Sequence, residues 1–107
     1  MTHTLSADQK KQFKTIGHQL KPIVTLGESG LSENVQKELE RALEDHELIK
    51  VKIPAAPKSE KQALLDELCK TCQCSLVQQV GNIALIYRAA KKPKAKLSNI
   101  LRQQQAK

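Results

Sequence analysis

The spacing of apolar residues along the chain switches between the helical and the strand period, so the pattern predicts both kinds of element. The first predicted helix covers residues 6–18. Ser6 and Gln9 form a capping box at its start, and apolar side chains follow at helical spacing, namely Phe13, Ile16 and Leu20. The run Pro22-Ile23-Val24-Thr25-Leu26 is typical of a short strand, with its proline at the first position, where a missing N–H matters least.

A second amphipathic helix is predicted to begin after Ser32, which is a good N-cap residue. Its apolar face consists of Leu31, Val35, Leu39, Ala42 and Leu43. Residues 48–53 then alternate in the strand period, with apolar side chains at positions 49, 51 and 53. This alternation places Lys50 and Lys52 together on the opposite side of the strand.

A third helix is predicted after Pro57, with Ser59 and Gln62 as another capping box. Its buried stripe is expected to contain Leu64, Leu65, Leu68, Cys69 and Cys72. Residues 74–80 and 83–87 are predicted strands, joined through Gly81-Asn82 as a tight hairpin. The order αβαβαββ predicts a single α/β domain with a mixed four-stranded sheet. Strand–helix–strand connections imply parallel pairing in that sheet, and the hairpin adds an antiparallel pair.

Charge is unevenly placed along the 107 residues, whose net charge is +7. From Arg88 to the C-terminus there are seven cations and no acid, whereas residues 1–87 hold eleven of each. We therefore expect a domain over residues 1–88 and a basic, flexible tail over residues 89–107. The tail favours an anionic partner. Phe13 and Tyr87 are too few to form the aromatic platform of an RNA-recognition motif, so contacts would be mainly to the nucleic-acid backbone.

The chain contains no stretch that approaches the roughly 20 apolar residues of a membrane span. Its N-terminus lacks the basic-then-apolar pattern of a signal peptide. Three cysteines without an export signal suit a reducing compartment. We expect a soluble cytoplasmic protein with no membrane partner.

The loop Gly27-Glu28-Ser29-Gly30, between the first predicted strand and the second helix, is the sharpest local signal. Glycines let the backbone approach a ligand closely, and a helix N-terminus presents free N–H groups that suit a phosphate. KH domains clamp nucleic-acid backbone with a GXXG loop of this kind. A plain strand-to-helix turn would also account for the two glycines. Lys21 just before the strand favours the binding interpretation.

The cysteine motif Cys69-x-x-Cys72-x-Cys74 invites a zinc or redox interpretation. A structural zinc site needs four ligands, and no second cysteine pair is present. A redox dithiol would lie at a helix N-terminus, whereas this pair falls at a predicted helix end, so small buried hydrophobes are the better interpretation. His18 and His46 each follow a helix and could cap it, contact RNA or act as a base. No catalytic arrangement stands out.

Four separated motifs occur in a recognisable order, namely Gly17-His18-x-Leu20-Lys21-Pro22-Ile23-Val24, Gly27-x-x-Gly30-Leu31-Ser32, Ala42-Leu43-Glu44-x-His46-Glu47-Leu48-Ile49-Lys50-Val51-Lys52 and Gly81…Leu85-x-Tyr87-Arg88. Over about residues 5–88 the chain thereby resembles the CRM domain, and more closely its free-standing bacterial form, the YhbY-type RNA-binding proteins. The resemblance implies a fold similar to the C-terminal domain of bacterial translation initiation factor three. It also implies an association with precursors of the large ribosomal subunit, as in the bacterial forms, whereas plant relatives act in organellar intron splicing.

By the same resemblance, Gly27 to Gly30 would be the RNA-contacting loop, backed by a basic surface. Family loops often carry a cationic or neutral residue where this chain has Glu28, whose carboxylate would repel a phosphate. We expect an RNA-binding protein, not an enzyme, that needs no cofactor, metal or small-molecule substrate and contacts precursor large-subunit ribosomal RNA or particles. The expected contacts are Gly27, Glu28, Ser29, Gly30, Lys14, Lys21, Lys50, Lys52 and Arg88.

Two alternatives remain beside this expectation. A DNA-coating protein of similar topology would neutralise phosphates in the same way, because backbone contacts do not choose between polymers. A thiol or metal module would instead use Cys69, Cys72 and Cys74.

Overall fold

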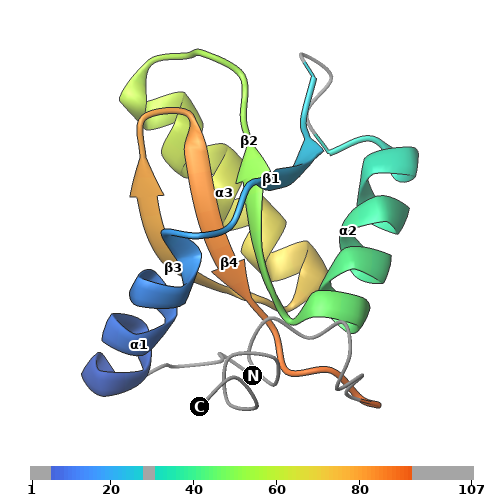
Figure 1. Cartoon of the computed structure of the whole chain (residues 1–107). Helices are drawn as coiled ribbons and strands as arrows, with labels where there is room; N and C mark the ends of the chain where they lie inside the picture. Colours follow the sequence, from blue (N-terminus) through green and yellow to red (C-terminus); the bar gives the residue numbers. More distant parts are fainter. Residues whose placement is uncertain (1–5, 28–30, 93–107) are drawn as a thin grey trace.

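A computed structural model describes residues 6–27 and 31–92 and contains the predicted order of helices and strands (Figure 1). The elements are α1 (Ala7–Gly17), β1 (Pro22–Thr25), α2 (Glu33–His46), β2 (Leu48–Lys52), α3 (Lys58–Cys72), β3 (Ser75–Val80) and β4 (Ile83–Tyr87). The four strands form one mixed sheet. The predicted single α/β domain is therefore confirmed.

The strand order across the sheet is β1-β2-β4-β3. β1 pairs with β2 in parallel, and β4 pairs antiparallel with both β2 and β3. Two strands joined through a helix were predicted to be parallel neighbours in the sheet. This prediction is wrong for β2 and β3, because β4 lies between them. The reason is visible in β4, where Ala84, Leu85 and Ile86 are all buried. Such a continuous apolar run needs cover on both sides, so β4 takes a central position and the more polar β3 forms an edge.

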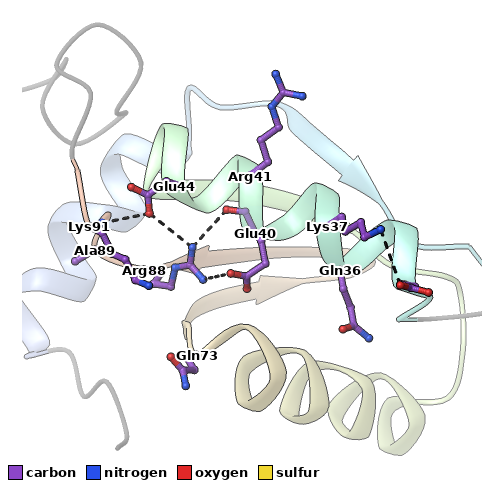
Figure 2. A pocket seen from close by; sticks show the side chains of 10 residues that line it. Gln36, Lys37, Glu40, Arg41, Glu44, Gln73, Arg88, Ala89 and Lys91 are labelled. Carbon is purple, nitrogen blue, oxygen red and sulfur yellow. Dashed lines mark hydrogen bonds and ion pairs between the residues drawn. The ribbon is translucent and has the colours of Figure 1, made fainter.

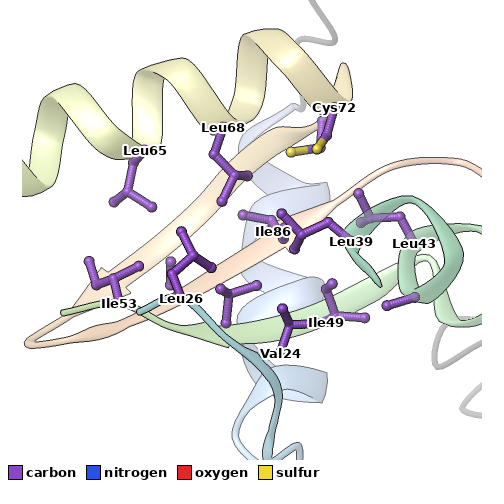
Figure 3. Close-up of a cluster of buried hydrophobic side chains, with 14 residues drawn as sticks. Val24, Leu26, Leu39, Leu43, Ile49, Ile53, Leu65, Leu68, Cys72 and Ile86 are labelled. Carbon is purple, nitrogen blue, oxygen red and sulfur yellow. The ribbon is translucent and has the colours of Figure 1, made fainter. Parts of the chain in front are cut away.

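The two faces of the sheet are covered unequally, with α1 on one face and α2 and α3 on the other (Figure 1). The larger core cluster lies between the sheet and the helices α2 and α3 (Figure 3), and it includes Val24, Leu39, Leu43, Ile49, Val51, Leu65, Leu68 and Ile86. The smaller cluster lies under α1 and consists of Phe13, Ile16, Leu48, Val77 and Leu85. Among the described residues, α1 is the only helix on its face and covers only part of it.

Side chains predicted to cap the first two helices do so. Ser6 Oγ accepts a hydrogen bond from Gln9 N at 3.1 Å, and Ser6 N donates one to Gln9 Oε1 at 3.0 Å, which completes the capping box of α1. Ser32 Oγ accepts from Val35 N at the start of α2. These local bonds stabilise the N-terminal ends of α1 and α2.

The capping box predicted for the third helix is wrong. α3 begins at Lys58, so Ser59 already lies inside the helix and the N-cap residue is Pro57. The Pro57 carbonyl accepts from Glu60 N and Lys61 N, and the Gln62 side chain donates to Asp66 instead of reaching back. Proline has a fixed φ that suits a helix entry, which allows the helix to start earlier than the serine would indicate.

Candidate nucleic-acid interface

Charge is divided between the two faces of the molecule. The four strands contain no acidic residue, and Asp8 is the only acid in the described ranges outside α2, α3 and the Glu47 cap. The helices α2 and α3 and the Glu47 cap, which together form the back of the molecule, hold nine acids, namely Glu33, Glu38, Glu40, Glu44, Asp45, Glu47, Glu60, Asp66 and Glu67. The face that α1 partly covers carries the cations Lys10, Lys11, Lys14, Lys21, Lys50 and Lys52, and we call it the cationic face.

β2 brings Lys50 and Lys52 onto the cationic face, as the alternation in the sequence predicts. Lys50 pairs with Leu85 and Lys52 pairs with Ile83 in the antiparallel ladder. Paired residues point to the same side of a sheet, so both lysines lie on the side of α1 rather than in the main core. Lys52 is exposed and Lys50 is half-buried.

The start of the Gly27–Gly30 loop lies next to these lysines. Leu26 N donates to the carbonyl of Lys52 at 2.8 Å, which keeps the end of β1 beside the end of β2. Gly27 is exposed, and a Cβ atom added to it would meet no atom of the described residues within 4 Å, its chain neighbours aside. Open space at this position leaves room for a ligand. The other three predicted loop contacts, residues 28–30, lie outside the described residues.

Lys21 and Lys14 complete the predicted lysines. Lys21 is exposed and directly precedes Pro22, which pairs with Lys50. Lys21 therefore lies next to Lys50 at the start of β1, and Gly27 lies next to Lys52 beyond the other end of that strand. Lys14 is exposed on the last turn of α1, on the same side of the sheet.

Arg88 is directed away from this group of lysines. Its guanidinium Nη1 lies 2.8 Å from Glu40 Oε1 (Figure 2). The same atom lies 3.1 Å from the Cys72 carbonyl oxygen. Its Nη2 lies 4.0 Å from Glu44. The side chain is only 16% exposed and ties the end of β4 to α2 and to the end of α3. We therefore leave Arg88 out of the cationic face.

Carboxylates at the end of α2 also hold the first residues after Arg88. Glu47 Oε2 accepts a hydrogen bond from Ala90 N at 2.9 Å, and the two Glu44 oxygens accept from Lys91 N and Lys92 N. Ordered backbone contacts thus continue to Lys92. The remainder of the predicted tail, residues 93–107, lies outside the described residues.

The three cysteines gather where α3 ends. Gln73 adopts a left-handed conformation, and Cys74 N donates to the Cys69 carbonyl at 3.0 Å, which is the bond pattern of a Schellman helix end. Cys72 and Cys74 are buried, and burial raises the pKa of the Cys72 thiol to about 11. A hydrogen bond between the thiols lowers the pKa of Cys69 and raises that of Cys74. Within the described ranges, no group of three or more His, Cys, Asp or Glu side chains could hold a metal ion.

A cavity of about 360 Å³ opens on the cationic face beside the end of α1. It is lined by His18, Lys50, Gln78, Val80, Ile83 and Leu85. His18 forms the C-cap of α1 and is exposed. Of the lining residues, sequence reasoning considered only His18 and Lys50 as functional. The sequence signal for this site was the polar Gln78 inside a predicted strand; the 65% exposure of Val80 is seen only in the structure.

Comparison with known proteins decides the family. Residues 5–88 match the model of the CRS1/YhbY (CRM) domain. The chain belongs to the CRM domain family. A protein of Pseudomonas aeruginosa named as a probable RNA-binding protein is 56% identical to this CRM protein over 92% of its chain and 94% of the relative. An RNA-binding protein of Haemophilus influenzae is 40% identical over 88% of this chain and 95% of its own.

The fold of this CRM protein is also found in a solved structure. The solution structure of a hypothetical protein from Staphylococcus aureus superimposes with a TM-score of 0.74 at 33% sequence identity. The match covers 85% of the CRM chain and 95% of the other. Among the described residues, no helix is long and apolar enough to cross a membrane.

Proposed function

We propose that this CRM protein binds RNA through its cationic face and the adjoining Gly27–Gly30 loop. The division of charge carries the proposal. Among the described residues, six cations and Asp8 lie on one side, whereas α2, Glu47 and α3 hold nine acids against five cations, namely Lys37, Arg41, Lys58, Lys61 and Lys70. RNA phosphates would be attracted to the first side and repelled from the second. Electrostatic attraction of this kind supplies most sequence-independent affinity and also orients the encounter.

Within this interface the residues have different roles. Lys21, Lys50 and Lys52 contribute charge along the edge formed by β1 and β2. Backbone N–H groups of the glycine loop, at the start of α2, bind a phosphate. Lys14 and the basic residues after Lys92 add attraction that does not depend on sequence.

The RNA that we propose as the partner is precursor large-subunit ribosomal RNA, in the cytoplasm. The family resemblance supports this partner, and the names of the relatives support RNA rather than DNA. The protein acts by binding, without a cofactor and without catalysing a reaction. Crosslinking the protein to RNA in growing cells and sequencing the attached fragments tests the assignment directly.

The crosslinking experiment has one supporting and one contradicting outcome. We expect the attached fragments to be concentrated in large-subunit ribosomal RNA and its precursors. Fragments spread in proportion to total cellular RNA would contradict the ribosomal partner. Competition between structured RNA and duplex DNA of equal length at one salt concentration separates RNA binding from DNA coating. We expect the protein to bind the RNA more tightly than the DNA.

The role of the loop can be tested at Gly27 without disturbing the fold. Gly27→Val adds bulk where, its chain neighbours aside, none of the described residues has an atom within 4 Å of the added Cβ, so the variant should fold normally. We expect its RNA affinity to fall, because the backbone can no longer approach a phosphate closely. Ala89→Val, at an exposed position beside the acidic helix, is the matched control. Full affinity in Gly27→Val would show that the loop is only a turn.

A further inference from the structure

The cavity beside His18 has a floor of aliphatic side chains and a polar rim. We propose that it holds one unpaired base of the bound RNA, so that the protein selects single-stranded or unstacked segments over continuous duplex. The inference rests on the proposed RNA-binding function and adds the kind of RNA that is chosen.

The aliphatic floor suits the face of a base. Val80, Ile83 and Leu85 line the cavity; Val80 is 65% exposed although it is a large apolar residue, whereas Leu85 is only 2% exposed and forms the base of the cavity. An unpaired base gains from covering such a surface, since both lose contact with water. Most single-strand binders use aromatic platforms for this purpose. Here Phe13 and Tyr87 pack against each other with ring centroids 4.5 Å apart under α1, so the sheet offers aliphatic side chains instead.

Strand register arranges the cavity in two parallel rows. Lys50 pairs with Leu85, which pairs with Gln78, and these three residues cross β2, β4 and β3 in one row. Lys52, Ile83 and Val80 form the neighbouring row in the same order. Each row therefore runs from a cation on β2 to an apolar residue on β4. Two strand spacings, roughly 10 Å, separate its ends.

This order matches the layout of a nucleotide. Phosphates would lie along β2, next to Lys21 and the start of the glycine loop, where the cations are. The attached base would then point across β4 toward β3. At that end the Gln78 amide offers a donor and an acceptor to a base edge, and the His18 imidazole closes the rim. In continuous duplex RNA the base is paired and stacked, so it cannot reach the floor.

Abasic RNA provides the decisive comparison, because it keeps the phosphates and removes the bases. Short single-stranded oligouridylate, oligocytidylate and oligoadenylate are each titrated into the full-length protein, alongside a strand of equal length whose bases are replaced by abasic sites. We expect at least one base-bearing strand to bind about fivefold more tightly than the abasic strand. NMR shifts of the Val80, Ile83 and Leu85 methyl groups should change with that strand and stay in place with the abasic one.

Variants locate the effect in the cavity. Gln78→Ala and Val80→Ser should each reduce the difference between the two strands, whereas Gln62→Ala removes the same amide from α3 and should leave the difference unchanged. Equal affinity for base-bearing and abasic strands, with RNA binding intact, would overturn the cavity assignment and leave the proposed function standing. Absence of binding to every single strand at low salt, with structured RNA still bound, would also overturn the cavity assignment, whereas absence of binding to structured RNA as well would overturn the proposed function. The methyl shifts of the unmodified protein decide the matter even if a variant fails to fold.

Discussion

Gly17 lies so close to Leu85 that a Cβ atom on Gly17 would stand 2.6 Å from Leu85 Cδ2. The contact joins the last turn of α1 to the central strand β4. Leu85 is only 2% exposed and packs with Phe13 and Ile16 of the same helix. This close approach packs the last turn of α1 directly on β4, and His18, the next residue, lies at the rim of the cavity on the cationic face.

Gly17→Ala should destabilise the protein. The added methyl group would force the buried Leu85 side chain to move, and overpacking of this kind costs about 1–3 kcal/mol. A gain in helix propensity of about 0.5–1 kcal/mol offsets part of the loss. Urea unfolding should show a lower midpoint with an unchanged slope. Gly27→Ala, where the methyl group meets open space, is the control and should stay near the stability of the unmodified protein.

Arg88→Ala should reduce stability and leave RNA affinity unchanged. The guanidinium binds Glu40 and the Cys72 carbonyl, and losing these charge-assisted bonds should cost about 1–3 kcal/mol. Lys52→Gln should have the opposite profile, with normal stability and weaker binding, because Lys52 is exposed on the cationic face. Denaturation and RNA titration of both variants check the pair. If the Arg88→Ala protein folds but loses RNA affinity, Arg88 contacts RNA and belongs to the binding interface.

Two truncations should differ in stability. Removing residues 93–107 should leave the free energy of unfolding unchanged and weaken binding to all RNAs alike, since four cations are lost. Removing residues 89–107 also deletes the N–H groups that bond to Glu44 and Glu47, and it places a new carboxylate beside these acids. We expect a further loss of about 1–2 kcal/mol. Equal thermal midpoints for the two truncated proteins would show that residues 89–92 contribute nothing.

Stability should fall at alkaline pH because of Cys72. Burial raises the pKa of this thiol from 9.0 to about 11, so the folded protein holds a proton that the unfolded chain releases. The contribution is complete below pH 9 and is lost as the pH rises from 9 through 11. Cys72→Ser, which does not titrate there, should flatten the decline in this interval when unfolding is measured at several pH values. Its RNA affinity near neutral pH should match the unmodified protein, because Cys72 packs on the far side of the sheet.

Local sequence patterns predicted the elements because the signals that form them are local. The Ser6–Gln9 capping box and the alternation at Ile49, Val51 and Ile53 each act within a few residues, and both appear in the structure. Strand order depends on contacts between segments that are distant in the chain. The prediction from chain order alone therefore placed β3 beside β2, where the structure has β4. The apolar run in β4 was the available signal for its central position.

The site was predictable to the extent that one strand defines it. The alternation in β2 was enough to put Lys50 and Lys52 on one face. Arg88 was assigned to the same surface because its partner Glu40 lies 48 positions earlier in the chain, beyond the reach of any local pattern. The cavity depends on the register among β2, β4 and β3, including the irregularity between Leu76 and Gln78, and no single segment encodes that register.

The salt dependence of RNA affinity tests the cationic face most directly. The double variant Lys50→Gln and Lys52→Gln is compared with a control that removes Lys37 and Lys70, two exposed lysines on the acidic back helices, in the same way. On single-stranded RNA, log K falls as log salt rises, and each lost phosphate contact makes this negative slope shallower by about 0.7. We predict that the slope of the Lys50→Gln and Lys52→Gln double variant is shallower by about 1.4. The control should keep the slope of the unmodified protein. Equal losses in both variants would contradict a defined RNA-binding face.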